Sequence, residues 1–201
     1  MNKFQDLLKD KKLLIFDFDG TIADTSSFHD QAFKEVLLNY PVDFSYKDIA
    51  GLSSFDAFKT IFKKNNISIS NQSLASLIDE KQEIARSLIS KFLKPEEGLY
   101  QFLKYADNHF QICIVSSGSN LSITNALEKI KLNQFFDEII SAEDVKNAKP
   151  SPEGFCKALD IFGISPDQAL IFEDSASGFQ AAEAANIDYL DVNSFIWSDL
   201  Y

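Results

Sequence analysis

The sequence predicts an α/β fold in which a parallel β-sheet lies between two layers of helices, with an all-helical insertion. Three short apolar runs, LLIFDF at 13–18, FQICIVSS at 110–117 and ALIFED at 169–174, are typical of strands that are buried on both faces. Strands that alternate with helical patterns indicate right-handed crossovers and a parallel sheet. The stretch from residue 24 to about 93 interrupts the alternation, because it contains helical patterns and no convincing strand.

The remaining elements follow in chain order. Residues 2–10 have the pattern of a short amphipathic helix that precedes the first strand. Ser151 and Pro152 mark the start of a later helix, because a capping residue stands before a proline at the first helical position. The other expected elements are weaker strands at 138–140 and 188–192 and helices at 95–107, 119–131, 152–162 and 175–186.

The interrupting stretch contains three predicted helices, at about 26–39, 46–64 and 71–93. These helices could simply belong to the core, or they could form a cap that leaves the α/β core after the first strand and later re-enters it. We expect the cap. The core domain then comprises residues 1–21 and 93–201, and the helical cap domain comprises residues 22–92.

Composition and charge exclude several classes of protein. The 201 residues carry 30 acidic and 19 basic side chains, a net charge of −11, so neither nucleic acid nor an anionic membrane is an expected partner. Two cysteines are too few for a disulfide scaffold or a Cys-rich zinc module. No apolar run approaches the roughly 20 residues of a membrane span, and the N-terminus lacks the apolar core of a signal peptide. We therefore expect a cytoplasmic protein and, by default, a monomer.

The first polar motif, DFDGT, follows the first predicted strand, at the edge where open α/β sheets bind ligands. Asp17 and Asp19 lie two residues apart on extended chain, so their side chains start on the same face. Two such carboxylates repel each other unless a cation or a proton intervenes, and hard oxygen ligands favour Mg²⁺. The alternatives are a solvated turn or a calcium loop, and the buried run before Asp17 argues against the calcium loop.

Three further motifs follow later strands. SSGSN at 116–120 places hydroxyl groups and a small-residue turn before a helix, which suits either a phosphate cradle or a helix cap. Lys149 precedes a proline and therefore lies in a loop, where its ammonium group reaches a shared anionic site or faces solvent. Glu173 and Asp174 end a buried strand, where acidic groups cost desolvation energy unless a cation compensates them or they cap a helix.

These four motifs, in this order after successive strands, closely resemble the motif set of the haloacid dehalogenase superfamily. DFDGTIADT, KPSPEGF and FEDSASGFQAA look like near-standard versions of its motifs. The resemblance covers nearly the whole chain, is weak inside the cap, and is closest to β-phosphoglucomutase-like and phosphoglycolate phosphatase-like members with a helical cap. It implies a Rossmann-like three-layer α/β/α core and a Mg²⁺-dependent phosphatase that acts on a small phosphorylated molecule.

The resemblance also implies roles for individual residues in a reaction that passes through an aspartyl-phosphate. Asp17 would be the nucleophile and Asp19 the general acid and base. The residues implied at the phosphate or the substrate are Ser116, Ser117, Gly118, Lys149 and, from the first cap helix, His29. The residues implied at Mg²⁺ are Asp17, Asp19, Asp174 and Glu173, with Glu173 bound either directly or through another ligand.

Asp19 argues for phosphoryl chemistry, because the dehalogenases of the superfamily lack an acid at that position. Two other positions favour a phosphatase over a mutase. The chain has Ser54 and Ser119 where β-phosphoglucomutase typically has an Arg and a Lys, and a neutral serine cannot anchor a second phosphate as Arg does. The lysines available in this region to bind a second phosphate instead are Lys47, Lys59 and Lys63.

The expected reaction is therefore hydrolysis of a small phosphomonoester, such as a sugar phosphate, phosphoglycolate or a nucleotide monophosphate. The first alternative is a β-phosphoglucomutase-like sugar-phosphate mutase. An alternative of another class is a non-catalytic module that binds phosphorylated metabolites. Against that last alternative, none of the motif residues is missing from the sequence.

Overall fold

The computed structural model describes residues 7–95 and 97–200, and its centre is a five-stranded parallel sheet with the strand order β3-β2-β1-β4-β5. The strands are β1 (Leu13–Phe16), β2 (Gln111–Val115), β3 (Glu138–Ile140), β4 (Ala169–Glu173) and β5 (Asp188–Asp191). Each predicted strand is present and every pairing is parallel, which confirms the predicted sheet. The helix predicted at 2–10 lies mostly outside the described residues.

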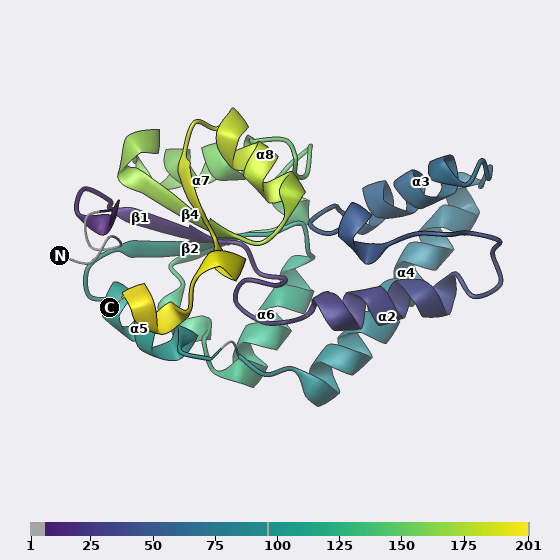
Figure 1. Cartoon of the computed structure of the whole chain (residues 1–201), viewed down its shortest axis with the longest axis horizontal. Helices are drawn as coiled ribbons and strands as arrows, with labels where there is room; N and C mark the ends of the chain where they lie inside the picture. The colour runs from purple at the N-terminus through teal and green to yellow at the C-terminus, as the bar shows by residue number, and fades with distance from the viewer. Residues whose placement is uncertain (1–6, 96, 201) are drawn as a thin grey trace.

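Helices cover both faces of the sheet, as the sequence predicts (Figure 1). One face packs against α7 (Glu153–Phe162) and α8 (Ala176–Ala184), and the other against α5 (Leu99–Ala106) and α6 (Asn120–Ile130). The central strand β1 is buried throughout, and alternate side chains serve the two faces: Ile15 belongs to one apolar cluster and Phe16 to the other. Phe16 also stacks on Phe172 of β4, with ring centroids 4.6 Å apart.

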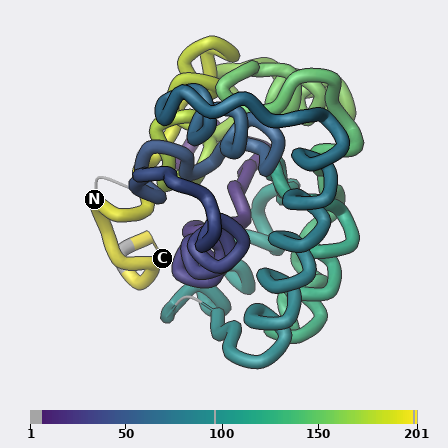
Figure 2. Tube along the Cα trace, turned by 90° about the vertical axis from the view of Figure 1, so that its right-hand side faces the viewer, coloured from purple at the N-terminus to yellow at the C-terminus, as the bar shows by residue number. Residues whose placement is uncertain are grey.

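The chain between β1 and α5 forms a separate group of helices beyond the carboxyl ends of the strands (Figures 1 and 2). These helices are α2 (Ser26–Val36), α3 (Ser54–Lys64) and α4 (Asn71–Phe92). They pack around an apolar core of their own, which includes the fully buried Phe58 and Phe62. The predicted all-helical insertion is therefore present. No helix in the described part of the chain is both long enough and apolar enough to cross a membrane.

The predicted helix at 46–64 is wrong in its first half. The structure has one 3₁₀ turn at Tyr46–Asp48, then an irregular loop, and α3 begins only at Ser54. Gly51 in this loop has a φ angle of +74°, a left-handed conformation that interrupts a helix and that glycine adopts without strain. Ser53 then caps α3, because its hydroxyl accepts a hydrogen bond from the backbone N–H of Asp56.

The two segments that join these helices to the sheet lie side by side. Ala23, on the way out, forms an isolated antiparallel bridge with Pro95, on the way back. Ile22 and Ile89, beside these segments, are buried in the same apolar cluster as one face of the sheet. In such a pair of adjacent linkers, a few residues can change their backbone angles and let the helices move as a unit relative to the sheet.

Candidate active site

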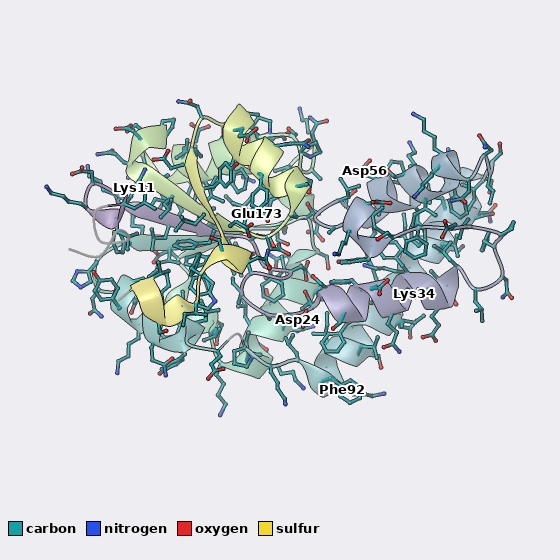
Figure 3. All side chains as sticks on the ribbon, viewed as in Figure 1. Lys11, Asp24, Lys34, Asp56, Phe92 and Glu173 are labelled. Carbon is teal, nitrogen blue, oxygen red and sulfur yellow. The ribbon has the colours of Figure 1, made fainter. Side chains whose placement is uncertain are left out.

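The carboxyl ends of the parallel strands bring most of the predicted site residues together. They are Asp17 and Asp19 after β1, Ser116 after β2, and Glu173 and Asp174 at the end of β4. Carboxylate oxygens of Asp17, Glu173 and Asp174 all lie within 4.8 Å of one another. Figure 3 shows Glu173 at the end of the sheet that faces the helical group. The site thus lies between the sheet and α2–α4.

Lys149 reaches this cluster from the loop before α7 and forms two ion pairs. Its Nζ lies 2.6 Å from Oδ1 of Asp17 and 2.8 Å from Oε1 of Glu173, and all three side chains are buried. Burial alone would lower the pKa of Lys149, but the charges of Asp17 and Glu173 outweigh it and raise the pKa above its usual value. The structure therefore holds a permanent positive charge directly against Asp17.

Glu173 is fully buried, and hydrogen-bond donors of the protein already occupy both of its oxygens. Oε1 accepts from Lys149, and Oε2 accepts from the backbone N–H groups of Asp174 at 2.6 Å and Ser175 at 2.9 Å. A carboxylate held in this way is better placed to position Lys149 than to bind a cation directly. The resemblance left open whether Glu173 binds Mg²⁺ directly or through another ligand, and it did not indicate a contact with Lys149.

The carboxylates of Asp17 and Asp174 form a donor set that fits a divalent cation. Burial, and after it the charge of Glu173, raises the pKa of Asp174 to about 7. Burial likewise raises the pKa of Asp17, against the opposing charge of Lys149. A single lysine thus faces three acidic groups, and hard carboxylate oxygens with an excess of negative charge suit Mg²⁺. Gly20 makes the close approach possible, because a Cβ there would lie 2.2 Å from Oδ2 of Asp174.

The turn after β2 contains the residues expected at the phosphate. Ser116 is buried, and its Oγ accepts a hydrogen bond from the N–H of Gly118 at 3.0 Å, which fixes the hydroxyl at the strand end. That hydroxyl can still donate its own proton into the site. Ser117 differs, because its hydroxyl donates a 3.0 Å hydrogen bond to the carbonyl of Gly51 in the loop before α3. The side chain of Ser117 therefore holds this loop against the sheet.

Asp19 is joined to the helical group by a chain of polar side chains. Its Oδ1 accepts a 2.5 Å hydrogen bond from the hydroxyl of Thr25 and lies 3.1 Å from Nε2 of His29. The Nζ of Lys81 lies 2.9 Å from Nδ1 of His29, so the imidazole ring links Lys81 to the carboxylate of Asp19. Burial alone would raise the pKa of Asp19, but His29 and then Thr25 lower it to about 2.

Lys81 is a functional candidate that the sequence analysis missed. It lies midway along α4 and is only 5% exposed, and its Nζ lies 3.5 Å from Oγ of Ser54. Burial lowers its pKa to about 8. One sequence feature could have identified Lys81. Residue 81 shares a helix face with the buried Leu77 and Ala85, so a charged lysine occupies a position where the helical pattern calls for an apolar side chain. The sequence analysis suggested three lysines for binding a second phosphate, namely Lys47, Lys59 and Lys63. The structure describes all three, and none of them lines the cavity.

A cavity of about 290 Å³ lies between the strand ends and the helical group. From the sheet side it is lined by Asp17, Asp19 and the turn at 116–119. From the other side it is lined by His29 of α2, the loop before α3 and one face of α4. The cavity therefore brings Asp17 of the acidic cluster, the phosphate turn and the polar chain of Asp19 together around one space.

Comparisons with known proteins agree with this geometry. A family model described as haloacid dehalogenase-like hydrolase matches residues 14–192. The fructose-1-phosphate phosphatase YqaB of Escherichia coli K12 is 33% identical over 183 residues, which cover 89% of this chain and 95% of the relative. A phosphorylated carbohydrates phosphatase of Thermotoga maritima is 25% identical over 179 residues, 87% of this chain and 82% of the relative.

Solved structures show the same fold. The crystal structure of β-phosphoglucomutase from Clostridium difficile has a TM-score of 0.81 at 26% identity, and the match covers 90% of this chain and 84% of that one. A hydrolase from Pseudomonas syringae has a TM-score of 0.82 at 22% identity, with 94% of this chain and 89% of that one covered. The chain therefore belongs to the haloacid dehalogenase-like hydrolase family, among its phosphatases.

Proposed function

We propose that this phosphatase hydrolyses a small phosphomonoester, in the first place a sugar monophosphate, with Mg²⁺ and through an aspartyl-phosphate on Asp17. The observation that carries the proposal is the buried cluster in which Lys149 bridges Asp17 and Glu173 beside Asp174. The cluster combines a nucleophile, a fixed positive charge and cation ligands at one end of the sheet. Because the cavity opens onto it, a phosphorylated compound inside would present its phosphorus atom to Asp17.

The first half of the proposed reaction transfers the phosphoryl group to Asp17. A carboxylate oxygen attacks phosphorus, the bond to the leaving oxygen breaks, and Asp19 protonates that oxygen. Lys149 and Ser116 hold the phosphoryl oxygens. Asp17 and Asp174 would hold Mg²⁺, which would supply positive charge that offsets the repulsion between the two anions. In the second half Asp19 takes a proton from water, the water oxygen attacks phosphorus, and the carboxylate of Asp17 is released.

The polar chain from Asp19 to Lys81 supports the second half of this reaction. Its hydrogen bonds favour the ionised form of Asp19, which is the form that accepts a proton from water. His29 and Lys81 belong to the helical group, so closure of that group against the core assembles the chain. We accordingly propose that residues 22–92 act as a cap that closes on a core of residues 1–21 and 93–201.

Sugar monophosphates are the favoured substrates for two reasons. The relatives from E. coli and T. maritima are named for fructose 1-phosphate and for phosphorylated carbohydrates. The cavity is small, about 290 Å³, and mixes apolar walls with a few polar groups, as small-molecule sites do. Phosphoglycolate and nucleotide monophosphates belong to the same class of small phosphomonoesters and remain to be compared with the sugars.

The proposed setting is the cytoplasm, with the protein acting as a monomer. Cys113 is buried and Cys156 is exposed, and both are free thiols in the structure. Free thiols are usual where the cell keeps cysteine reduced. The net charge of −11 favours a freely diffusing protein over one bound to nucleic acid or to an anionic membrane.

A sugar-phosphate mutase is the second candidate, and the position of Lys81 favours it. Its ammonium group lies 3.5 Å from Ser54, where the mutase typically has an Arg, so it offers a positive charge for a second phosphate. Against this, Lys81 already donates to His29. Ser119 caps α6 by accepting from the N–H of Ser122, and it adds no charge. The phosphatase is therefore the better supported of the two.

The experiment that tests the proposal is phosphate release from a panel of phosphomonoesters, with Mg²⁺ and with EDTA. The panel contains fructose 1-phosphate, β-glucose 1-phosphate, phosphoglycolate and a nucleotide monophosphate. We expect Mg²⁺-dependent release, fastest from a sugar phosphate. Conversion of β-glucose 1-phosphate in the presence of a bisphosphate primer, without release, would identify a mutase instead. Binding of the panel without any turnover would identify a non-catalytic module.

Removal of Mg²⁺ should change stability in a pH-dependent way. Without metal the pKa of Asp174 is raised from 3.8 to about 7, so the folded protein binds this proton more tightly than the unfolded chain does. Stability without Mg²⁺ should therefore fall as the pH rises from about 4 to about 7. Because Mg²⁺ competes with the proton, it should raise the melting temperature more at about pH 8 than at about pH 5. If Mg²⁺ raised the melting temperature equally at about pH 8 and about pH 5, in the wild type and in Asp174→Asn alike, Asp174 would not be a ligand of the metal.

Gly51→Ala should weaken closure of the cap. A Cβ at this position would lie 2.3 Å from the hydroxyl oxygens of Ser175 and Ser177, and the φ angle of +74° disfavours any side chain. The strain, on the order of 1–3 kcal/mol, acts on the loop that contacts the core and not on either apolar core. We expect kcat/KM to fall by about tenfold and the melting temperature to fall by a few degrees, as measured by steady-state kinetics and thermal unfolding.

Gly163→Ala is the matched control for this prediction. Gly163 also has a positive φ angle, +64°, but a Cβ there would have no atom within 4 Å. It lies at the end of α7, away from the cavity lining. Equal kcat/KM values for the two variants would show that closure does not depend on the close approach of Gly51 to the core.

A further inference from the structure

Arg86 is the single arginine of the chain, and it lines the active-site cavity. It lies on α4, five residues beyond Lys81, which corresponds to about 7.5 Å along the helix axis. Gln82, one turn before Arg86, lines the same cavity. Both side chains are partly buried, and within the described part of the chain neither forms a hydrogen bond or an ion pair.

The absence of a partner for Arg86 requires an explanation, because the chain has 30 acidic residues. A guanidinium group carries five N–H donors in a fixed fork, and partial burial without acceptors costs free energy. Glu83 lies three residues earlier on the same helix, a spacing that suits an ion pair, yet no such pair forms. Donors that face a cavity and lack acceptors in the protein are available to a ligand.

Acceptors and an aromatic ring line other parts of the same cavity. Ser119 and Glu143 come from the core side, and Oε2 of Glu143 accepts from the N–H of Asn120, which fixes the carboxylate at the start of α6. Phe55 comes from α3 and is 44% exposed, with Nζ of Lys59 4.2 Å from its ring centroid. Donors, acceptors and an aromatic face together suit a run of hydroxyl groups on a carbon chain. A second phosphate fits less well, because the carboxylate of Glu143 would repel it.

We propose that Arg86, together with Gln82, binds the hydroxyl groups at the end of the sugar remote from its phosphate. This inference rests on the proposed function, and it names the part of the substrate that the cap recognises. Lys81 contacts His29, which in turn contacts Asp19, the acid and base of the proposed reaction. Arg86 lies about 7.5 Å further along α4. A substrate extended along this helix therefore reaches Arg86 only if its carbon chain is long enough. Arg86 is in this account a specificity residue that does not touch the reacting atoms.

The test compares one long and one short substrate, fructose 1-phosphate and glycerol 1-phosphate. We expect Arg86→Gln to lower kcat/KM for fructose 1-phosphate by about tenfold or more, the effect of losing a charged hydrogen bond. For glycerol 1-phosphate the change should stay within about twofold, because the shorter chain ends before Arg86. Arg86→Lys should restore little, since a lysine lacks the planar fork. Lys91→Gln removes an exposed positive charge from the same helix and should leave both values unchanged.

Three results would overturn the proposal. Equal losses on both substrates, or no loss on either, would show that Arg86 does not read the length of the carbon chain. A wild-type preference for fructose 1,6-bisphosphate that Arg86→Gln abolishes would assign Arg86 to a second phosphate instead.

Failure of the proposed function is distinguishable from failure of this inference. If the wild type releases no phosphate, calorimetric binding of the same two compounds carries the test, in Asp17→Asn protein with and without Arg86→Gln. Binding of fructose 1-phosphate that weakens about tenfold, while binding of glycerol 1-phosphate stays the same, supports the inference. Equal binding in both proteins, or no binding of fructose 1-phosphate, overturns it.

Discussion

Asp17→Asn is expected to lower phosphate release by about 10⁴-fold or more and to leave the protein folded. An amide cannot attack phosphorus, and Glu173 cannot take the same place, because hydrogen bonds occupy both of its carboxylate oxygens. The substitution removes an ion pair with Lys149 but also removes repulsion from the neighbouring acidic groups. These effects oppose each other, so the melting temperature should change little. Steady-state kinetics and thermal unfolding measure the two quantities.

Asp24→Asn is the matched control for this variant. Asp24 is exposed and lies on the same segment of chain, where Figure 3 labels it, and it is not among the residues that line the cavity beside Asp17. The same chemical change should therefore leave turnover close to that of the wild type. Wild-type-like turnover in Asp17→Asn would contradict the assignment of the nucleophile.

Lys149→Met is expected both to destabilise the protein by about 3–5 kcal/mol and to abolish most of the activity. The substitution leaves Asp17 and Glu173 buried without their shared positive charge. It also removes a charge from the place where the phosphoryl oxygens would lie, a loss that costs roughly 10²–10³-fold in rate at comparable sites. Urea unfolding gives the free energy, and single-turnover kinetics gives the rate at saturating substrate.

Lys157→Met tests whether burial causes the loss of stability. Lys157 pairs with Asp144 at 3.1 Å, but both side chains are 37% exposed. Loss of such a surface pair costs about 1 kcal/mol or less. A second variant, Lys149→Met with Glu173→Gln, should regain part of the stability because one of the stranded charges is removed. If Lys149→Met were as stable as Lys157→Met, the buried cluster would not have the energetic role given to it here.

Most of the fold was predictable because it depends on local patterns. The apolar run LLIF is typical of a strand buried on both faces, and the structure buries all four residues. Parallel strands end at one edge, so polar residues that follow different strands, such as Asp17 and Glu173, meet there although they are far apart in the chain. The resemblance then connected these residues with phosphoryl transfer, and the family match agrees with it.

The cap side of the site was not predictable, because it depends on how helices pack and not on their own sequences. Lys81 and Arg86 belong to a helix whose pattern indicates only an amphipathic element, and its contact with the cavity follows from tertiary packing. The predicted helix at 46–64 runs across Gly51, whose positive φ angle interrupts it before α3. Whether Glu173 binds a cation or positions Lys149 depends on backbone N–H groups that no sequence pattern reveals.

The most direct test of the central claim is to trap the phosphorylated enzyme. Protein mixed with a sugar monophosphate and Mg²⁺ is quenched in acid within the first turnover, digested and examined by mass spectrometry. The account predicts one added phosphoryl group on the peptide that contains Asp17, sensitive to hydroxylamine as an acyl phosphate is, and absent from Asp17→Asn. Phosphate release at the wild-type rate with no phosphoryl group on Asp17 at any quench time, or with one on another residue, would contradict it.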